Sequence, residues 1–502
     1  MTRDELLATL VDDATIDAAQ AIVGLAVEYL AETSRGVGPV SRSTPVRDVA
    51  RRFDGPLPDE GCSLDEVARR LRDDVMREAN RLSHPMYVGH QVSPPLPVAI
   101  WTDSVIAALN GSQAVREMSP ATTFVERQVV RWMCRLAGFG DASGGTFTSG
   151  GTEATLTALL AARARLLPNA WADGVRGASG TAVGAAVGAA VGAAVGAESP
   201  VVLCGVHAHY AVSRAVGVMG LGVRNAVTVA SDGYRMDPRA VRTTLESLRR
   251  DGRPVLAVVA TAGSTATGSF DDLPAIADCC AEFGCWLHVD AAHGGSALFS
   301  PAHRHRVRGI DRVDSLAWDP HKMMLLPLAA GMVLVRDAAV LDSAFAQQAP
   351  YLFHQTDDEP SYDIGPRSFQ CSRRGDVLKV WAALLRYGRS GIAGFYEHLC
   401  ELTAGFHELV SAHPRFEALH RPETNILCFR YTGADARGEA AADAVNRELR
   451  ERYNAAGEGW ITSTLLDGRR VLRVTIINPR TTPQHLQRVL DGVDAIGATL
   501  SR

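Results

Sequence analysis

The chain has 502 residues, of which 46% are hydrophobic, 21% charged and 6% aromatic, and its formal net charge is −5. A chain of this length exceeds what one hydrophobic core supports, so we expect two or three packed units, and the composition excludes a wholly disordered or collagen-like protein. The mildly acidic balance gives no reason to expect a nucleic acid or an anionic membrane surface as a partner.

The N-terminal thirty residues predict amphipathic helix. A secretory signal starts with basic residues followed by a charge-free apolar run, whereas this chain starts with acidic ones. No apolar run reaches the roughly 18–20 residues that a membrane-spanning helix needs. The nine cysteines lack the spacing of a zinc site, so we interpret them as buried free thiols. These features predict a cytoplasmic protein that binds no metal.

The chain divides into three predicted segments. Residues 1–85 show the apolar periodicity of amphipathic helices. Residues 86–374 alternate short apolar strands with helices, which is typical of a largely parallel sheet covered on both faces. Residues 375–502 begin with a long helix and predict a smaller α+β domain. The clearest strands of the central segment are VVLCGV (201–206), VLAVVAT (255–261), CWLHVDAA (285–292) and GMVLVRD (331–337).

Part of the glycine content lies in one repeat. Residues 182–197 are four tandem copies of Ala-Val-Gly-Ala, between a predicted helix and the strand that starts at 201. Each glycine weakens a helix by roughly 1 kcal/mol relative to alanine, and the repeat is too short for a membrane span. We therefore expect a mobile surface insertion that takes no part in the chemistry.

Four features follow the predicted strands, at the edge where open α/β sheets bind their ligands. Gly150 and Gly151 run into a helix whose N-terminus favours an anion, although such a pair is often only a turn. Asp290 ends an apolar strand, where it either meets a cation or caps the next turn. Lys322 fits a Schiff-base nucleophile or a surface charge. His209 fits a ring-covering group or a structural histidine.

Taken together, these four features meet the needs of one cofactor. Pyridoxal phosphate requires a lysine for its aldehyde, a carboxylate for its pyridine nitrogen, an anion cradle for its phosphate and a group that covers its ring. The order of the four features along the chain allows one strand–loop–strand passage between Asp290 and Lys322. The combination is far more specific than any one of its members.

The sequence resembles the group II pyridoxal-phosphate-dependent amino acid decarboxylases, which include glutamate, cysteine sulfinate, aromatic amino acid and 2,4-diaminobutyrate decarboxylases. The resemblance runs from about Ser83 to the C-terminus. The DPHK motif after HVDAA distinguishes this group from aminotransferases of the same fold. The motifs that carry the resemblance are SGGTEA (149–154), AHY (208–210), TAGSTATGSFDDL (261–273), HVDAAHGG (288–295), DPHK (319–322), APYLF (349–353), QCSRRGDVLKVW (370–381) and LRVTIINP (472–479).

The resemblance implies roles for individual residues. It implies that Lys322 binds the cofactor aldehyde, that Asp290 pairs with the pyridine nitrogen, and that Arg473 takes the substrate α-carboxylate. It also implies fold type I, the aspartate-aminotransferase-like α/β fold, with a large cofactor domain, a small α+β domain and a homodimer that shares its active sites. The remaining implied contacts are His209 and Ala292 on the ring faces, Gly151, Thr152 and His321 at the phosphate, Thr261 at the ring substituents, and Gln91 at the substrate side chain.

The sequence departs from the family pattern at two places. The tyrosine that the family uses to protonate the substrate Cα falls near Asp358 or Glu359, while Tyr362 matches a second family tyrosine. We therefore expect Tyr362 to be the acid, with His209 as the alternative donor. The second departure is Asp319, where many relatives carry asparagine, because a carboxylate there repels phosphate unless it faces away or is paired.

The resemblance implies decarboxylation of an L-amino acid to an amine and CO2. The segment HQVSPPLP favours a short polar or acidic substrate over a bulky aromatic one, and a substrate carried by a carrier protein stays open. The first alternative is an aldehyde-forming oxidative enzyme or another lyase on the same cofactor. The second is a non-catalytic homologue that acts as a binding partner.

Overall fold

The computed structural model describes residues 2–178, 199–346, 349, 351–353, 361–433 and 437–501. The Ala-Val-Gly-Ala repeat and the positions 358 and 359 lie outside these described residues. Contacts between Cα atoms group the chain into two compact units. Unit 1 comprises residues 1–94, 402–421 and 427–502, and unit 2 comprises residues 95–401 and 422–426.

A seven-stranded mixed sheet forms the centre of unit 2. Its strand order is β1-β9-β8-β7-β6-β2-β3, with β9 antiparallel to both of its neighbours and the remaining pairs parallel. The parallel strands therefore end at one edge, which places their C-terminal residues side by side. The strands are β1 (Gly144–Thr148), β2 (Val201–Gly205), β3 (Ala226–Val229), β6 (Val255–Thr261), β7 (Trp286–Asp290), β8 (Ser315–Trp318) and β9 (Gly331–Val335). This sheet confirms the mostly parallel α/β architecture.

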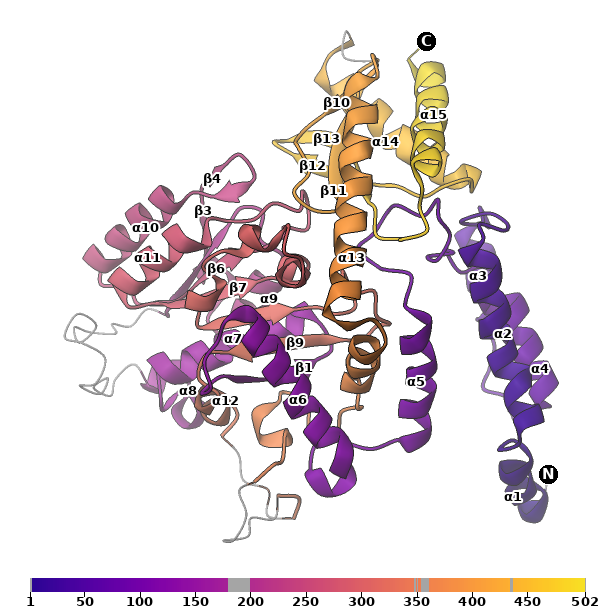
Figure 1. Cartoon of the computed structure of the whole chain (residues 1–502), viewed down its shortest axis with the longest axis horizontal. Coiled ribbons are helices and arrows are strands. Elements are labelled where there is room, and N and C mark those ends of the chain that lie inside the picture. The colour runs from indigo at the N-terminus through magenta and orange to yellow at the C-terminus, as the bar shows by residue number, and fades with distance from the viewer. Residues whose placement is uncertain are drawn as a thin grey trace. The chain divides into compact units, whose positions relative to one another are not determined.

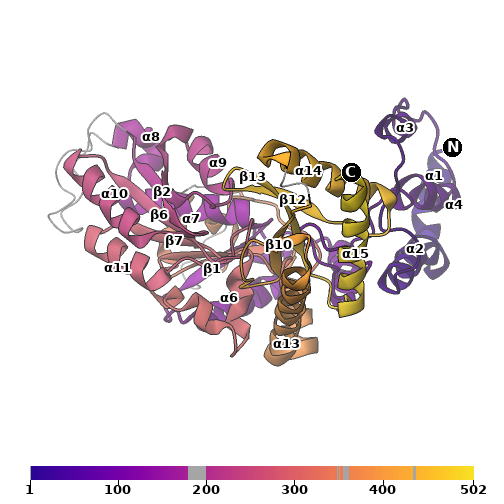
Figure 2. The ribbon, with the colours of Figure 1, turned by 90° about the horizontal axis from the view of Figure 1, so that it is seen from above.

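Helices cover both faces of this sheet, and the hairpin β4 (Ser231–Asp232) and β5 (Arg235–Met236) stands beside it. Figure 1 shows α10 and α11 lying side by side, and in Figure 2 α8 and α9 lie on one side of the strands while α6 and α11 lie on the other. The helices are α5 (Pro97–Leu109), α6 (Pro120–Ala137), α7 (Gly151–Leu166), α8 (Ala170–Ala178), α9 (Ala211–Val218), α10 (Pro238–Arg250), α11 (Leu273–Phe283), α12 (Ala339–Ala344) and α13 (Val377–Ala412).

Local sequence sets the bounds of α11, which leads into the strand of the predicted carboxylate. The Asp272 side chain accepts the Ala275 N–H at 3.3 Å and caps the helix, with Pro274 in the first turn. Gly284 ends the helix with a φ of 69°, a left-handed conformation that glycine adopts without a steric penalty. The chain then turns directly into β7.

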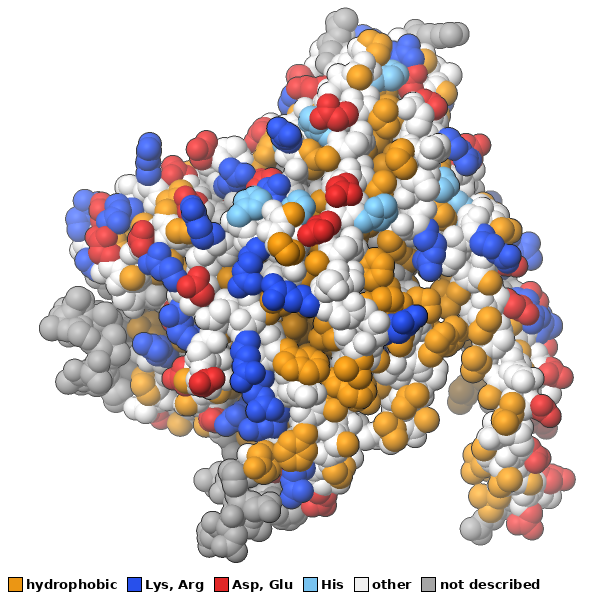
Figure 3. All heavy atoms as spheres, in the orientation of Figure 1, with side chains coloured by type: hydrophobic (Ala, Val, Ile, Leu, Met, Phe, Trp, Pro, Cys, Tyr) orange, Lys and Arg blue, Asp and Glu red, His pale blue; other side chains and the backbone are white. Residues whose placement is uncertain are grey.

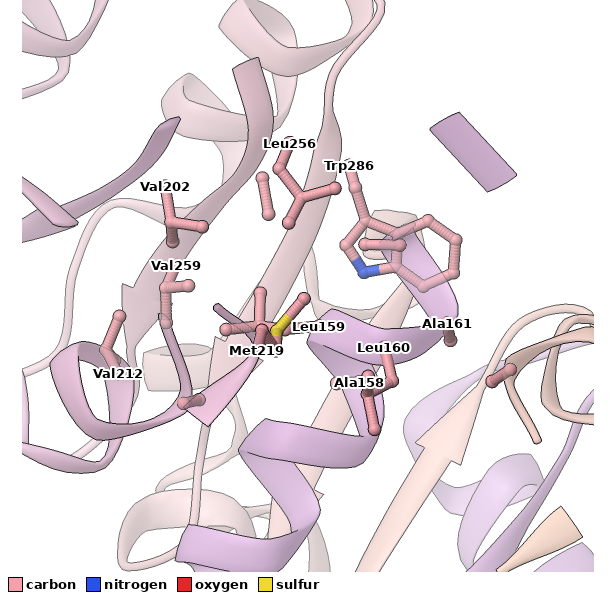
Figure 4. Packing of buried hydrophobic residues seen from close by; sticks show 14 of the residues in the cluster. Ala158, Leu159, Leu160, Ala161, Val202, Val212, Met219, Leu256, Val259 and Trp286 are labelled. Carbon is pink, nitrogen blue, oxygen red and sulfur yellow. The ribbon is translucent and has the colours of Figure 1, made fainter. Parts of the chain in front are cut away.

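The core of unit 2 lies between α7 and the sheet. Figure 4 shows Ala158, Leu159, Leu160 and Ala161 of α7 among side chains from β2, β6, β7 and α9. The alanines let the helix approach the strands closely, and full burial of a side chain such as Leu159 contributes about 1.5–3 kcal/mol. This packing fixes the position of the α7 N-terminus relative to the strand ends.

Unit 1 contains a four-stranded antiparallel sheet with the order β10-β11-β13-β12. Its core includes side chains from this sheet, from the last turns of α13 and from the segment around Tyr87. Its strands are β10 (Phe416–Ala418), β11 (Ile426–Tyr431), β12 (Thr462–Leu466) and β13 (Arg469–Thr475). Its helices are α1 (Arg3–Asp12), α2 (Ile16–Ser34), α3 (Val46–Arg52), α4 (Leu64–Arg70), a π-helix at Leu71–Met76, α14 (Glu439–Ala456) and α15 (Pro483–Leu500).

The division by contacts differs from the three segments 1–85, 86–374 and 375–502 expected from the sequence. Residues up to 94 group with the C-terminal elements, because the backbone of Tyr87 bridges to Trp460 and the Val88 N–H bonds the Trp460 carbonyl at 3.0 Å. The helix α13 is divided between the units near residue 401. Among the described residues, no helix combines the length and the apolar composition that crossing a membrane requires.

Candidate active site

Three strand ends of unit 2 bring the predicted site residues together. Thr261 ends β6 and is directly paired with Asp290, which ends β7. The next strand, β8, ends at Trp318 and leads into the loop that carries Asp319, His321 and Lys322. The parallel arrangement therefore places Thr261, Asp290 and the lysine loop at one edge of the sheet.

Asp290 is a buried carboxylate with 8% relative exposure. One of its oxygens accepts the Ala292 N–H at 3.1 Å, and it forms no ion pair with any residue in the described parts of the chain. Removing a carboxylate from water is costly unless a cation or hydrogen-bond donors compensate. Asp290 is thus suited to hold a cationic donor such as a protonated pyridine nitrogen.

Lys322 lies beside a second carboxylate. Its Nζ is 3.2 Å from Oδ2 of Asp319, and the same oxygen is 3.5 Å from Nε2 of His321. The His321 Nδ1 bonds the Ala330 carbonyl at 2.7 Å, and burial lowers the pKa of His321 although the Asp319 charge raises it. Asp319 is therefore paired with Lys322, which offsets the repulsion between its carboxylate and a bound phosphate.

The turn before α7 forms an anion cradle. The Glu153 carboxylate accepts the backbone N–H and the hydroxyl of Ser149 at 2.9 and 2.6 Å, which holds the turn in place. A Cβ at Gly151 would lie 2.9 Å from Ala292 and 3.1 Å from Asp319, and one at Gly331 would lie 2.5 Å from Gly150 Cα. Glycine is therefore required at both positions, and the first N–H groups of α7 stay open to an anion.

His209 interacts electrostatically with Asp290, Asp319 and Lys322, and these four residues form the charge cluster of the site. Burial lowers its pKa, while the charges of Asp290 and Asp319 raise it and that of Lys322 lowers it. Its Nδ1 accepts the Ala211 N–H at 3.3 Å, which orients the ring at the start of α9. Two further predicted residues lie here: Ala292 is buried in the turn after β7, and Thr152 is in the first turn of α7.

Unit 1 contains the two predicted substrate-binding residues. Arg473 on β13 is 9% exposed, has a buried Nε without a hydrogen-bond partner, and forms no ion pair with any described residue. Burial lowers the pKa of its guanidinium. Gln91 is half-buried, and its Nε2 has no hydrogen-bond partner among the described residues. Arg473 is thus a buried cation without a counter-charge, and Gln91 is a buried amide donor without an acceptor.

Tyr362 lies elsewhere in unit 2. Its ring is 5.1 Å from that of Phe124 on α6, and the guanidinium of Arg127 stands 5.0 Å from its centroid. These contacts do not join it to Lys322. Its role as the acid stays a prediction, and of the two candidate donors only His209 shares the charge cluster.

Sequence reasoning missed several residues that support this site. Asp271 accepts the Thr261 N–H at 2.7 Å and the Met236 N–H at 2.8 Å, and burial raises its pKa to about 6. Lys379 on α13 is fully buried and donates to the Ala329 carbonyl at 2.9 Å. Their contacts connect residues that are distant in the chain. The only sequence signal for them is therefore the motif that contains each residue, GSFDDL for Asp271 and DVLKVW for Lys379.

The residues of unit 2 fit pyridoxal phosphate. A glycine cradle at a helix N-terminus suits its phosphate, a carboxylate without an ion pair suits its pyridine nitrogen, and a lysine suits its aldehyde. Oδ1 of Asp319 is buried without a hydrogen-bond partner among the described residues, so this site also contains an unsatisfied acceptor.

Comparisons with known proteins agree with this geometry. Residues 48–432 match the family model of the pyridoxal-dependent decarboxylase conserved domain. The chain is 32% identical over 448 residues to an L-2,4-diaminobutyrate decarboxylase of Rhizobium meliloti (strain 1021), which covers 88% of this chain and 83% of that protein. It is 31% identical over 415 residues to an L-aspartate decarboxylase of Metarhizium robertsii, with 81% and 79% covered. The crystal structure of mouse CSAD in apo form matches with a TM-score of 0.85 and 26% identity, covering 96% of this chain and 99% of that one.

Proposed function

Because the chain belongs to the pyridoxal-dependent decarboxylase family, and is thus a pyridoxal-phosphate-dependent amino acid carboxy-lyase of fold type I, we propose that its substrate is a free L-amino acid with a short polar or acidic side chain. The observation that carries the amino acid part of this proposal is Arg473, a buried cation that no carboxylate of the described chain neutralises. Arginine binds a carboxylate through two parallel hydrogen bonds, which also orients it.

The remaining site residues receive roles from their positions. Pyridoxal phosphate, when bound, withdraws electrons from the substrate Cα and so stabilises the charge that remains as CO2 leaves. We assign Lys322 to the cofactor aldehyde, and Asp290 to keeping a proton on the pyridine nitrogen through its negative charge. We assign the binding of the phosphate to Gly151, Thr152 and His321.

We propose that His209 and Ala292 contact the two faces of the cofactor ring and that Thr261 lies near the ring substituents. His209 is also the donor that we favour for the proton delivered to Cα, since it shares the charge cluster of Lys322, whereas Tyr362 packs on α6. A His209→Gln variant that still forms amine at the wild-type rate would return this role to Tyr362.

The relatives support the substrate class. Two of them are named for 2,4-diaminobutyrate and aspartate, both of which have short polar or charged side chains. Gln91 supplies a buried amide donor for such a side chain. A hydrogen-bonding site discriminates strongly against analogues that leave its buried donors unpaired.

The direct test is a panel of free L-amino acids, with CO2 and amine measured together. We expect turnover of aspartate, cysteine sulfinate, glutamate or 2,4-diaminobutyrate, and little turnover of phenylalanine or tryptophan. Preferred turnover of the aromatic pair would overturn the substrate class. Release of aldehyde, ammonia and peroxide in place of amine would favour the oxidative alternative, and turnover only of a carrier-bound amino acid would replace the free substrate.

Arg473→Ala tests the carboxylate contact. We expect kcat/KM to fall by about 10²-fold, since a charge-assisted hydrogen bond to a buried partner contributes roughly 1.5–3 kcal/mol. Arg470→Ala, on the same strand, is the matched control and should retain activity. An unchanged kcat/KM in Arg473→Ala would remove this residue from the substrate site.

We also propose a homodimer in a reducing, cytoplasmic compartment. Unit 2 exposes apolar side chains along α5 and neighbouring helices, and Figure 3 shows the apolar surface over α5, α6 and α13. A patch of this kind marks an interaction surface, and the expected partner is a second copy of this chain. All nine cysteines are free thiols, as a reducing compartment maintains. The apolar side chains include Trp101, Val105, Leu109, Phe124 and Leu385.

Sedimentation equilibrium tests the dimer. The wild type should sediment as a dimer, and Val105→Glu combined with Leu109→Glu on α5 should shift it toward the monomer, because each substitution places a charge on the apolar surface. A wild-type monomer at micromolar concentration would contradict the proposal.

A further inference from the structure

A cavity of about 410 Å³ lies at the opposite edge of the unit 2 sheet, where β6 and β7 begin. Its walls come from the C-terminal turn of α7, from α11 and from the first residues of both strands. The volume falls in the range of about 300–1,000 Å³ typical of small-molecule sites. Trp286 begins β7 in this wall and Asp290 ends the same strand, so about 13 Å of strand separates the cavity from the cofactor site.

The cavity has an apolar floor. Leu256 and Leu287 line it together with Trp286, and Figure 4 shows Leu256 and Trp286 beside each other above α7. The Trp286 Nε1 donates to the Ser315 hydroxyl at 2.8 Å, so the ring is held in a fixed orientation and its polar atom is already satisfied. A ligand therefore meets this wall through apolar contacts.

Both signs of charge face the same cavity without neutralising each other. Asp314 lines it and forms no ion pair within 4.0 Å in the described chain, although one oxygen accepts the Leu287 N–H at 2.8 Å. The Arg165 side chain also lines it and forms neither a hydrogen bond nor an ion pair with a described residue, whereas Arg312, the third arginine of the lining, pairs with Asp278 at 2.6 Å. Arg336 uses Nε and Nη2 on the Val313 carbonyl, which leaves its Nη1 available.

The pKa of Asp314 depends on its burial and on its neighbours in the cavity. Burial raises it, whereas the Leu287 N–H and the charges of Arg336 and Arg165 lower it. The carboxylate and the two guanidinium groups are thus near enough to interact yet too far apart to form an ion pair. A molecule that carries an ammonium and a carboxylate can bridge this gap, and a simple anion or cation satisfies only one side of it.

We propose that this cavity is a second ligand site, which binds a zwitterionic α-amino acid with an apolar side chain. The ammonium group pairs with Asp314, the carboxylate pairs with Arg165 and Arg336, and the side chain packs on Leu256, Leu287 and Trp286. The site is distinct from the decarboxylation site, because its residues lie at the amino-terminal edge of the sheet and those of the cofactor site lie at the carboxyl-terminal edge.

Titration calorimetry of the cofactor-loaded enzyme with L-leucine and L-phenylalanine tests this proposal. We expect saturable binding that leaves the visible absorption of the cofactor unchanged, which separates it from binding at Lys322. The analogues 4-methylpentanoate and 3-methylbutylamine, which lack the amine and the carboxylate respectively, should bind at least tenfold more weakly. Equal binding of either analogue, or no binding of both amino acids, overturns the proposal.

Two variants and a control locate the site. Asp314→Asn keeps an acceptor for the Leu287 N–H, and Arg165→Gln changes an exposed residue of α7, so both should fold. Each should weaken amino acid binding at least tenfold, whereas Arg224→Gln, an exposed arginine outside the cavity, should not. Wild-type affinity in both Asp314→Asn and Arg165→Gln would place the ligand elsewhere and overturn the assignment.

Cysteine alkylation tests the position of the ligand without calorimetry. Cys285 lines the cavity, whereas Cys371 is exposed and lies outside it. L-leucine should slow alkylation of Cys285 by iodoacetamide at least threefold and leave Cys371 unaffected. Equal alkylation rates of Cys285 with and without saturating L-leucine would count against the proposed position of the ligand.

Discussion

The chain has only two lysines among its 51 basic residues, and unit 2 places them in opposite environments. Lys322 follows β8, retains 19% side-chain exposure and has one carboxylate beside its Nζ. Lys379 on α13 has no exposed side-chain surface, and its Nζ donates to the Ala329 and Pro327 carbonyls at 2.9 and 3.5 Å.

The partners of each lysine explain the difference. Lys379 pairs with Asp376 at 2.9 Å and lies 3.9 Å from Asp103, so its charge is compensated on several sides. Because it bonds carbonyls of the loop that follows Lys322, its ammonium group fixes that loop. A reactive amine must exchange its partners, whereas a structural amine must keep them. Access and a small number of partners, more than the residue type, therefore distinguish the nucleophile.

The largest expected effect is the loss of Lys322. Lys322→Ala should lower kcat by roughly 10³-fold or more, because it removes the covalent anchor and its proton chemistry. Borohydride reduction of the loaded wild type should attach the cofactor to Lys322 and not to Lys379. With two lysines in the chain, peptide mass spectrometry reads this result directly. Full activity in Lys322→Ala, or label on Lys379, would reverse the roles of the two lysines.

The second effect concerns stability. Lys379→Met should lower the free energy of unfolding by about 3 kcal/mol, because Asp376 and two carbonyls lose a buried cation. Arg386→Met, an exposed cation on the same helix, is the control and should change stability by less than about 0.5 kcal/mol. Denaturant unfolding measures both. Equal midpoints for Lys379→Met and the wild type would show that the buried lysine is not structural.

The two lysines also mark how far sequence reasoning reaches. Lys322 could be predicted because DPHK follows the HVDAA strand, and a strand end with these residue types specifies both a place and a chemistry. Lys379 could not, since its partners at 327 and 329 lie about fifty residues away in the chain, and only tertiary packing joins them. Gly150 and Gly151 could be predicted for the same reason, because they too follow a strand and have the residue type that an anion site needs.

Other features depended on the packing in the same way. The alternation of strands and helices predicted the sheet, but not that residues up to 94 group with the C-terminal strands, because the pairing of Tyr87 with Trp460 leaves no local signal. The matching of Tyr362 to a family position likewise did not foretell its packing on Phe124. Asp314 and Arg165 line the same cavity although they are far apart in the chain, and no sequence motif marks either of them.

The two lysines should also differ in their chemical accessibility. Acylation of the cofactor-free protein by acetic anhydride should modify Lys322 on the order of 10-fold faster than Lys379, because a fully buried amine reacts only after local opening. Added pyridoxal phosphate should protect Lys322 and leave the slow rate at Lys379 unchanged. Mass spectrometry of the two peptides gives both rates. Faster acylation of Lys379 would contradict the structural role.

The smallest expected effect comes from the carboxylates that pair with the lysines. Asp319 contacts Lys322 and lies against the anion cradle, with Oδ2 3.1 Å from where a Cβ on Gly151 would stand. Asp319→Asn removes a buried negative charge that repels the phosphate, so pyridoxal phosphate should bind at least a few-fold more tightly, since about 1.4 kcal/mol of interaction energy corresponds to a tenfold change in affinity.

The matched variant is Asp376→Asn, beside Lys379, which should destabilise the protein and leave cofactor affinity unchanged. Equilibrium fluorescence titration of the cofactor-free proteins measures the affinity without reference to activity. Weaker binding in Asp319→Asn would mean that the carboxylate serves the cofactor site by holding Lys322 and His321 in place, and that this positioning outweighs its repulsion of the phosphate. The sign of the change therefore decides whether the carboxylate beside the reactive lysine acts mainly as a charge or, like Asp376 beside the buried lysine, as a structural partner.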